Sequence, residues 1–300
     1  MPSEKKKRKK PYVPHEAAAK FKPSEDWTHE EAFRLYNEAK FSLETDKVIY
    51  EDCIQGMRRL PAECVDVVVA DPPFGISFDG MSAAYNRDAG LVVEGYNEVE
   101  GDYSDFTDQW IAEIPRLLKG EGVVWIFSGW TNLADVLEAV ERHDLTLINH
   151  IIWKYQFGVF TRRKFVTSHY HILLLAKHPK KYYFNKIEHY PLDVWEINRK
   201  YMARRAKNST KLPEEVVMRC IDFTSRPGGL IFDPFMGNGT TAVAAKGSYR
   251  HFLGFEINKQ MRKIIDENIA MLEVGDLYVP YAQRPDDLVE RAREKFGMEK

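Results

Sequence analysis

The feature that most constrains this chain is a nearly uninterrupted run of apolar, mostly β-branched residues at 65–70. Such a run is typical of a strand buried on both faces, as in a parallel sheet. Similar short runs recur and alternate with helical patterns, which predicts an α/β doubly wound sheet. The other expected strands are 48–50, 123–127, 145–153, 172–176, 230–232 and 252–255.

Helical patterns separate these runs. Thr28 and Glu31 have the spacing of a capping box at the start of one helix. Pro115 is expected to kink the helix over 105–118, because proline lacks the backbone N–H that a helix interior uses. The remaining helices are expected at 15–20, 132–142, 213–223 and 259–273, with an acidic, glycine-containing loop at 78–103.

The composition supports a large folded interior. Hydrophobic residues make up 44% of the 300 and aromatic residues 13%, which excludes a wholly disordered chain. No stretch approaches the ~18 consecutive apolar residues of a membrane span, and the basic N-terminus lacks the apolar core of a signal peptide. The three cysteines, Cys53, Cys64 and Cys220, are scattered, which fits a reducing compartment and no metal-type spacing.

Asp71, Pro72, Pro73 and Phe74 directly follow the run at 65–70. In open α/β sheets, ligands bind at the carboxyl ends of the strands, so chemistry is expected here. The prolines carry no backbone donors, which leaves a carboxylate, backbone carbonyls and an aromatic ring. This set suits the exocyclic amino group of a flipped base, since Asp71 and the Pro72 carbonyl can accept its two N–H groups while Phe74 stacks on the ring. An ordinary proline-rich turn is the alternative.

A second pattern combines a short apolar run, a glycine turn and an alanine-rich helix. It is neither a phosphate-binding P-loop nor the dinucleotide fingerprint, whose residues and spacing differ. The next expected strand ends at Glu256, where an acid can hold ribose hydroxyls. A nucleoside cofactor without pyrophosphate therefore fits, with S-adenosylmethionine as the leading candidate. The expected cofactor residues are Phe232, Asp233, Pro234, Phe235, Gly237, Asn238, Gly239, Thr240 and Glu256.

The formal charge of −2 conceals strong local charge. Residues 153–211 contain fourteen Lys or Arg and three acids, whereas 71–121 contain eleven acids and three basic residues. Clustered cations interleaved with aromatic residues are typical of a nucleic-acid-binding segment, and a solvated basic face is the alternative. The stretch 160–169 is the expected target-recognition part, where Arg162 or Arg163 could read guanine edges. His169 and His171 share a strand face, but no third ligand suggests a metal.

The two motifs together resemble those of the β-group S-adenosylmethionine-dependent DNA amino-methyltransferases. The catalytic motif of these enzymes is Asp/Asn/Ser-Pro-Pro-aromatic, and their cofactor motif often reads Asp-Pro-Phe-x-Gly-Ser-Gly-Thr. Here Phe74 replaces the commoner tyrosine, and Asn238 the usual serine. Because the catalytic motif comes first, the resemblance implies a Rossmann-like methyltransferase sheet in circularly permuted order.

The resemblance covers about 47–272 and implies further site residues. Asp52-Cys53 is similar to a Gly-Asp-Cys run of the family, which implies that Asp52 contacts the cofactor adenine. Lys211 corresponds to a lysine assigned to the methionine carboxylate, although it stands one place early. An apolar-Trp-x-Lys element of the family lies near the target-base pocket and is similar to 152–154. The expected DNA contacts are Trp153, Lys154, Arg162, Arg163, Lys164 and His169.

The sequence thus predicts an S-adenosylmethionine-dependent DNA methyltransferase that flips adenine and methylates its N6 amino group. In the family, Asp at the first motif position favours adenine, whereas cytosine N4 enzymes more often have Ser. Cytosine N4 methylation is therefore the first alternative. An RNA substrate and a non-catalytic DNA-binding regulator are the others. Duplex DNA is the expected partner, a homodimer and a cognate restriction enzyme are open, and no membrane or metal is expected.

Three regions are expected along the chain. Residues 1–45 form a basic tail and helical extension, 46–275 the catalytic domain with a target-recognition insertion at about 155–207, and 276–300 a C-terminal helical extension. The expected location is cytoplasmic, in association with the nucleoid. The basic run Lys5–Lys10 is also compatible with a DNA-gripping arm or a nuclear-localisation signal.

Overall fold

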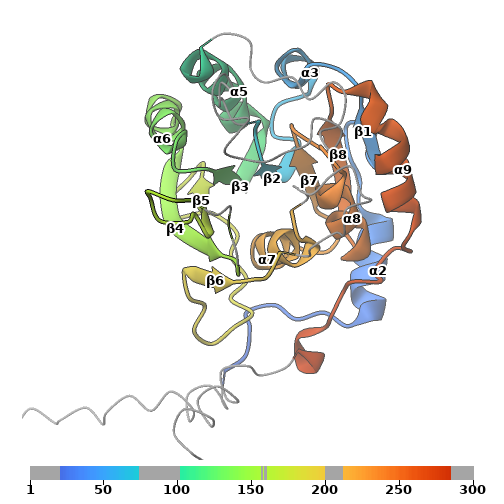
Figure 1. The fold of residues 1–300 in the computed structure, drawn as a ribbon. Helices are drawn as coiled ribbons and strands as arrows, with labels where there is room; N and C mark the ends of the chain where they lie inside the picture. Colours follow the sequence, from blue (N-terminus) through green and yellow to red (C-terminus); the bar gives the residue numbers. More distant parts are fainter. Residues whose placement is uncertain (1–20, 74–101, 157, 159–160, 200–211, 285–300) are drawn as a thin grey trace, which may run out of the picture.

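The computed structural model describes residues 21–73, 102–156, 158, 161–199 and 212–284, and shows one mixed sheet between helices (Figure 1). The strands are β1 (Lys47–Ile49), β2 (Val65–Ala70), β3 (Leu118–Ser128), β4 (Thr146–Lys154), β5 (His169–Ala176), β6 (Val194–Glu196), β7 (Leu230–Asp233) and β8 (His251–Phe255). The helices and 3-10 turns are α2 (His29–Glu38), α3 (Cys53–Arg59), α5 (Tyr103–Leu117), α6 (Leu133–Arg142), α7 (Glu214–Thr224), α8 (Thr240–Gly247), η2 (Lys259–Met261), α9 (Arg262–Ala270) and η3 (Tyr281–Gln283). The helix expected at 15–20 and most of the loop expected at 78–103 lie outside the described residues.

The strands lie in the order β1-β8-β7-β2-β3-β5-β4-β6. Neighbouring strands run parallel except where β5 is one of the pair. In β5, Leu173 pairs with Ile126 of β3 and Ile172 with Ile151 of β4, both in antiparallel register. The expected α/β sheet is confirmed, but it is mixed rather than all-parallel, because an apolar run does not encode strand direction.

Alternating residues of the strands feed two cores on opposite faces of the sheet. In β2, Val67 and Val69 pack with apolar residues of α7 and α8. Val68 and Ala70 point the other way and pack with α3, α5 and α6. Figure 1 shows these two groups of helices on either side of the sheet. Among the described helices, none is long and apolar enough to span a bilayer.

Several local expectations are confirmed and others need correction. Thr28 caps α2, and its backbone N–H donates to the Glu31 carboxylate at 2.8 Å, which completes the capping box. Pro115 lies in the last turn of α5, and the helix ends two residues later at Leu117. The sequence analysis did not predict α3 and β6. They have seven and three residues, which is too short for a recognisable hydrophobic period. The helix expected at 259–273 begins instead as the turn η2.

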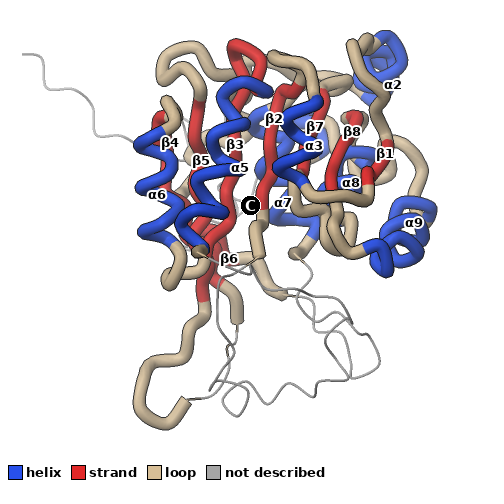
Figure 2. The backbone as a smooth tube through the Cα atoms, turned by 90° about the horizontal axis from the view of Figure 1, so that it is seen from above, coloured by secondary structure: helices blue, strands red, loops and turns tan. Residues whose placement is uncertain are grey.

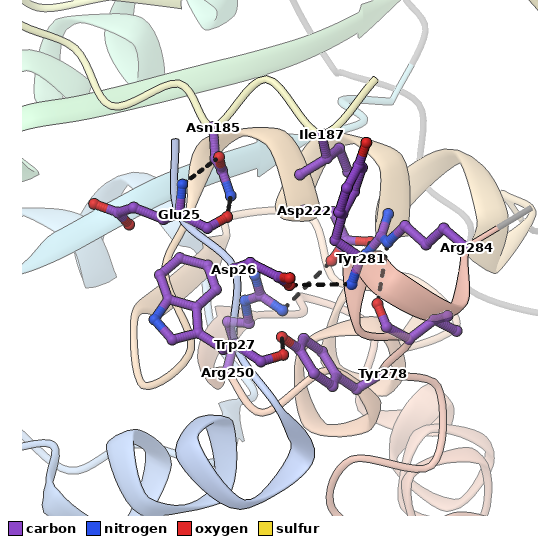
Figure 3. A pocket seen from close by; sticks show the side chains of 11 residues that line it. Glu25, Asp26, Trp27, Asn185, Ile187, Asp222, Arg250, Tyr278, Tyr281 and Arg284 are labelled. Atoms are coloured by element: carbon purple, nitrogen blue, oxygen red, sulfur yellow. Dashed lines mark hydrogen bonds and ion pairs between the residues drawn. The ribbon is translucent and has the colours of Figure 1, made fainter. Parts of the chain in front are cut away.

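The two ends of the described chain meet beside α7 and β8, around the buried side chain of Arg250 (Figure 3). Arg250 is 2% exposed, and its Nη1 lies 3.4 Å from Asp222 Oδ1. Arg284 Nη2 donates to Asp222 Oδ2 at 2.7 Å, and the Tyr278 hydroxyl donates to the Trp27 carbonyl at 2.9 Å. Because both terminal segments pack directly on the sheet region, the three-region division of the chain stays a prediction.

Replacing Asp222 with alanine is expected to lower the free energy of unfolding by about 3 kcal/mol, because it removes the carboxylate that compensates the buried charge of Arg250. The other acceptors of Arg250 are Ser225 and Ser248 oxygens, which carry no charge. Urea unfolding followed by circular dichroism measures the change. Arg34→Ala, which breaks an exposed ion pair, is the control and should change stability by less than about 0.5 kcal/mol. Equal midpoints for Asp222→Ala and the unaltered protein would contradict the prediction.

Candidate functional site

Four acidic side chains gather at one edge of the sheet. Strands β1, β8, β7 and β2 are parallel neighbours, so their carboxyl ends lie side by side. Asp233 ends β7, while Asp52, Glu256 and Asp71 stand within three residues after β1, β8 and β2. The structure therefore brings together residues that the sequence places up to about 200 positions apart.

Asp71 directly follows β2 and starts the rigid segment that the sequence singled out. It keeps partial solvent exposure, but enough protein surrounds it that desolvation raises its pKa to about 7, opposed by the charge of Arg199. Pro72 is buried and Pro73 half-buried, so the segment is anchored in the protein. Phe74 lies outside the described residues.

The glycine turn between β7 and α8 has the backbone geometry that requires glycine. Gly237 and Gly239 have φ of 54° and 80°, in the left-handed region. A Cβ on Gly237 would meet only the Phe235 carbonyl at 3.7 Å, so this side of the turn is open to a ligand. Asn238 and Thr240 complete the turn, and the Asn238 carbonyl accepts a hydrogen bond from Asn268 Nδ2 at 2.9 Å.

Glu256 organises this turn from the end of β8. Its Oε2 accepts the Gly237 N–H at 2.7 Å, and its Oε1 accepts the Asn258 N–H at 2.8 Å. Desolvation raises the pKa of Glu256, whereas these two hydrogen bonds lower it. Since each carboxylate oxygen has a second lone pair, Glu256 can still accept hydrogen bonds from a bound ligand.

Asp233 is 4% exposed, and the charges of both Asp71 and Glu256 act on it. Desolvation raises its pKa to about 7, and repulsion by the other two acids adds to the increase. Its Oδ1 accepts the Phe235 N–H at 2.8 Å, which fixes the start of the turn, and the next residue, Pro234, is buried. Asp233 therefore stabilises the start of the turn and is also one of the four acids at this edge of the sheet.

Other expected cofactor residues lie partly in the core. Phe232 is fully buried, and Phe235 packs edge-on against Trp110 with ring centroids 5.3 Å apart. Cys53 is 7% exposed, and desolvation raises the pKa of its thiol to about 12, so it has the environment of a structural cysteine. Asp52 caps α3 by accepting the Gln55 N–H at 2.9 Å. Lys211 lies outside the described residues.

The expected DNA-contacting residues lie at the other half of the same edge. Figure 2 shows the segment before β5 extending beyond the sheet, on the side where β2 ends. Arg162, Arg163 and Lys164 are exposed on this segment, next to Phe165, which is 99% exposed. Lys154 is also exposed and forms a 2.9 Å ion pair with Glu196.

Trp153 lies in a different environment from the one expected, and the expected histidine pair has a further neighbour. Trp153 is fully buried, and its indole N–H donates to the Ile197 carbonyl at 2.8 Å, so it belongs to the core rather than to an open DNA surface. His169 and His171 do share a face, with ring centroids 5.2 Å apart. Sequence reasoning missed their third neighbour, His150, whose Nε2 lies 2.8 Å from His171 Nδ1.

Sequence reasoning also missed the special position of Arg199, which it counted only among fourteen cations. The guanidinium of Arg199 lies over the Tyr155 ring, 4.1 Å from its centroid, and its charge acts on Asp71. A second missed residue is Tyr50, whose buried hydroxyl finds no hydrogen-bond partner among the described residues. Tyr50 follows β1 beside Glu256, so an unused polar atom points to a ligand at this edge.

Comparisons with known proteins point to one enzyme family. A family model described as DNA methylase, for enzymes of the N6 and N4 type, matches residues 65–267. The chain is 28% identical over 271 residues to "DNA adenine methyltransferase YhdJ" of Escherichia coli, covering 80% of this chain and 86% of the relative. It is 26% identical over 246 residues to "Type II methyltransferase M.HinfI" of Haemophilus influenzae, covering 75% and 68%.

Solved structures show the same fold at low sequence identity. A complex titled "M1.HpyAVI-SAM" aligns with a TM-score of 0.55 and 19% identity, covering 74% of this chain and 98% of that one. The "PVUII DNA methyltransferase (cytosine-N4-specific)" aligns with a TM-score of 0.56 and 12% identity, covering 80% and 100%. Since the family model spans two thirds of the sequence, the chain belongs to the N6/N4 DNA methylase family.

Proposed function

We propose that this protein transfers a methyl group from S-adenosylmethionine to the N6 amino group of adenine in duplex DNA, with the target base flipped out of the helix. The observation that carries the proposal is the position of Asp71-Pro72-Pro73 at the end of β2, next to β7 and its glycine turn. A target base and a cofactor held at neighbouring strand ends can meet with their reacting atoms aligned. YhdJ, which is named a DNA adenine methyltransferase, supports adenine.

The acidic edge supports S-adenosylmethionine as the cofactor. Gly237 leaves space for close approach, Glu256 has spare acceptor lone pairs, and the Tyr50 hydroxyl has no hydrogen-bond partner among the described residues. Asp52, three residues after β1, is the residue that we expect to contact the adenine part, as the family resemblance implies. When bound, the cofactor supplies the methyl group as an electrophile.

The residues of this chain then have distinct roles. Asp71 and the Pro72 carbonyl accept the two N–H groups of the target amine, which makes its nitrogen more nucleophilic. Bound S-adenosylmethionine would supply the methyl carbon for the new bond to nitrogen, with its sulfonium sulfur as the leaving group, and the amine proton would leave to Asp71 or to solvent. No covalent bond to the protein is needed, so the catalysis comes from positioning and electrostatics.

Two other functions are considered for this site. Cytosine N4 methylation uses the same chemistry, and the fold match to a cytosine-N4-specific enzyme keeps it as the second candidate. A DNA-binding regulator without activity would need neither the Asp71 carboxylate nor the open glycine turn. The remaining parts of the proposal are a permuted order of the methyltransferase sheet, a target-recognition insertion at about 155–207 and a cytoplasmic location with DNA as the partner.

Asp71→Ala is expected to reduce methyl transfer by at least about 100-fold, because it removes one acceptor of the target amine. The assay incubates duplex DNA with labelled S-adenosylmethionine and identifies the modified nucleoside by mass spectrometry. Glu138→Ala, an exposed carboxylate on α6, is the control and should keep full activity. N4-methylcytosine as the product would select the second candidate. DNA binding without any transfer by the unaltered protein would select the regulator, and full activity of Asp71→Ala would refute the mechanism.

The exposed cations before β5 are expected to neutralise DNA phosphates. Replacing Arg162 and Arg163 together with alanine should reduce the slope of log K against log salt by about 2, since each phosphate contact contributes about 0.9. Fluorescence anisotropy of labelled duplex DNA at several salt concentrations measures the slope. The control replaces Lys40, which follows α2, and Lys263, which lies in α9. Both are exposed, and Figure 1 shows these helices beside β1, away from β4 and β5, so the slope should stay unchanged. A slope that stays constant in the Arg162/Arg163 variant would remove this segment from the interface.

A further inference from the structure

Arg199 is held by three aromatic rings at the carboxyl edge of the sheet. Its guanidinium carbon lies 4.1 Å from the ring centroid of Tyr155, 4.9 Å from that of Tyr170 and 5.2 Å from that of Trp153. Tyr170 is the register partner of Trp153 across β4 and β5, and their rings stack 5.7 Å apart. A planar guanidinium suits such a site, because it is weakly hydrated and attracted to ring faces.

The backbone of Arg199 is fixed as firmly as its side chain. Gln156 Nε2 donates to the Arg199 carbonyl at 2.8 Å, and Gln156 Oε1 accepts the Arg199 N–H at 2.9 Å. Two residues earlier, the Ile197 carbonyl accepts the indole N–H of the buried Trp153 at 2.8 Å. These bonds attach the segment after β6 to the end of β4, so the guanidinium has little freedom to move away.

The charge of Arg199 acts on the acidic half of the edge. It opposes the rise of the Asp71 pKa that desolvation causes, and it also lowers the pKa of Tyr170, which desolvation and the charge of Asp71 raise to about 12. Among the described residues, Arg199 lowers the pKa of Asp71, and the charge of Asp71 raises the pKa values of Tyr170 and Asp233. The buried Nε of Arg199 finds no acceptor among the described residues, so a donor remains available there.

Val67 and Val69 of β2 lie in the same core cluster as Trp153 and Tyr155, and continued alternation puts Asp71 on that face of the sheet. We propose that Arg199 is a positioning residue for methyl transfer: the aromatic rings and Gln156 hold its guanidinium on this face, and the fixed cation favours the charged form of the Asp71 carboxylate, which accepts the target amine. The inference rests on the proposed function. Its chemical basis is that a protonated carboxyl becomes a donor and would face an amine that is also a donor. A cation fixed nearby prevents this without forming a bond to the substrate.

The role needs a fixed positive charge that acts on Asp71, and this separates it from a structural role or a phosphate contact. A purely structural Arg199 would stabilise β6 without affecting the ionisation of Asp71. A phosphate contact would contribute to the salt dependence of DNA binding but not to ionisation. The chain offers a matched control in Arg219, whose guanidinium also stacks on two rings, 5.0 Å from the Trp195 centroid and 5.1 Å from that of Phe223. Arg219 pairs with Glu188 and is not among the charges that act on Asp71.

The first experiment measures the titration of Asp71 directly and needs no activity. Protein labelled with carboxyl-13C aspartate is titrated by NMR, and the Asp71 signal is assigned by its loss in Asp71→Asn. In Arg199→Gln, the midpoint should rise by about one pH unit, because an opposite charge has been removed. Arg199→Lys should restore most of the shift, and Arg219→Gln should leave the midpoint unchanged. An unchanged midpoint in Arg199→Gln overturns the inference.

The second experiment measures single-turnover methyl transfer against pH in the same variants. The acidic limb of Arg199→Gln should shift upward by about one unit, so that its rate is about 5-fold low at pH 7 and recovers above about pH 9. A rate reduced equally at every pH, or a change only in the salt slope of DNA binding, would instead show a structural or phosphate role. If the Asp71 midpoint shifts as expected but no variant transfers methyl, the proposed function fails while the electrostatic link stands.

Discussion

The parallel alignment of β1, β8, β7 and β2 is the constraint on which the site depends. Because these strands run the same way, the chain must leave the sheet at the same edge four times, and each exit carries an acid. Burial of these carboxylates is unfavourable in itself, as the raised pKa values of Asp71, Asp233 and Glu256 indicate. The fold tolerates this because the two large apolar cores on both sheet faces supply the stability.

Close packing behind the glycine turn determines its shape. Met236 N–H donates to the Phe255 carbonyl at 2.8 Å, which joins the turn to the end of β8. A Cβ on Gly254 would come within 2.1 Å of Met236 Cε and 2.7 Å of the Asp233 carbonyl oxygen. Gly254 is therefore needed for β8 to approach β7 closely enough for Glu256 to accept the Gly237 N–H. The acid and the turn form one unit rather than two neighbouring features.

The sequence predicts β2, β3, β5, β7 and β8 well because they are largely buried apolar runs. It predicts the two motifs because their residue types are unusual. It does not predict the direction of β5, since register and direction depend on partners such as Leu173 and Ile126 that are distant in the chain. It misplaces Trp153 because an aromatic residue in a basic segment can face either core or solvent. It overlooks Arg199 because the three rings that distinguish it come from strands 29 to 46 residues earlier.

The strand order also separates charge along the edge. The acids stand at the ends of β1, β8, β7 and β2, whereas the cations stand beside β4, β5 and β6, so a net charge near zero divides into two opposed halves. Under the proposed function, the acidic half suits a sulfonium cofactor, which is positively charged, and the basic half suits DNA phosphates. Arg199 is the cation that acts across the boundary on Asp71. The target amine would therefore lie between the acidic and the basic half of the edge. Asp71, which holds it, has a protonation state that depends on the charges of both halves.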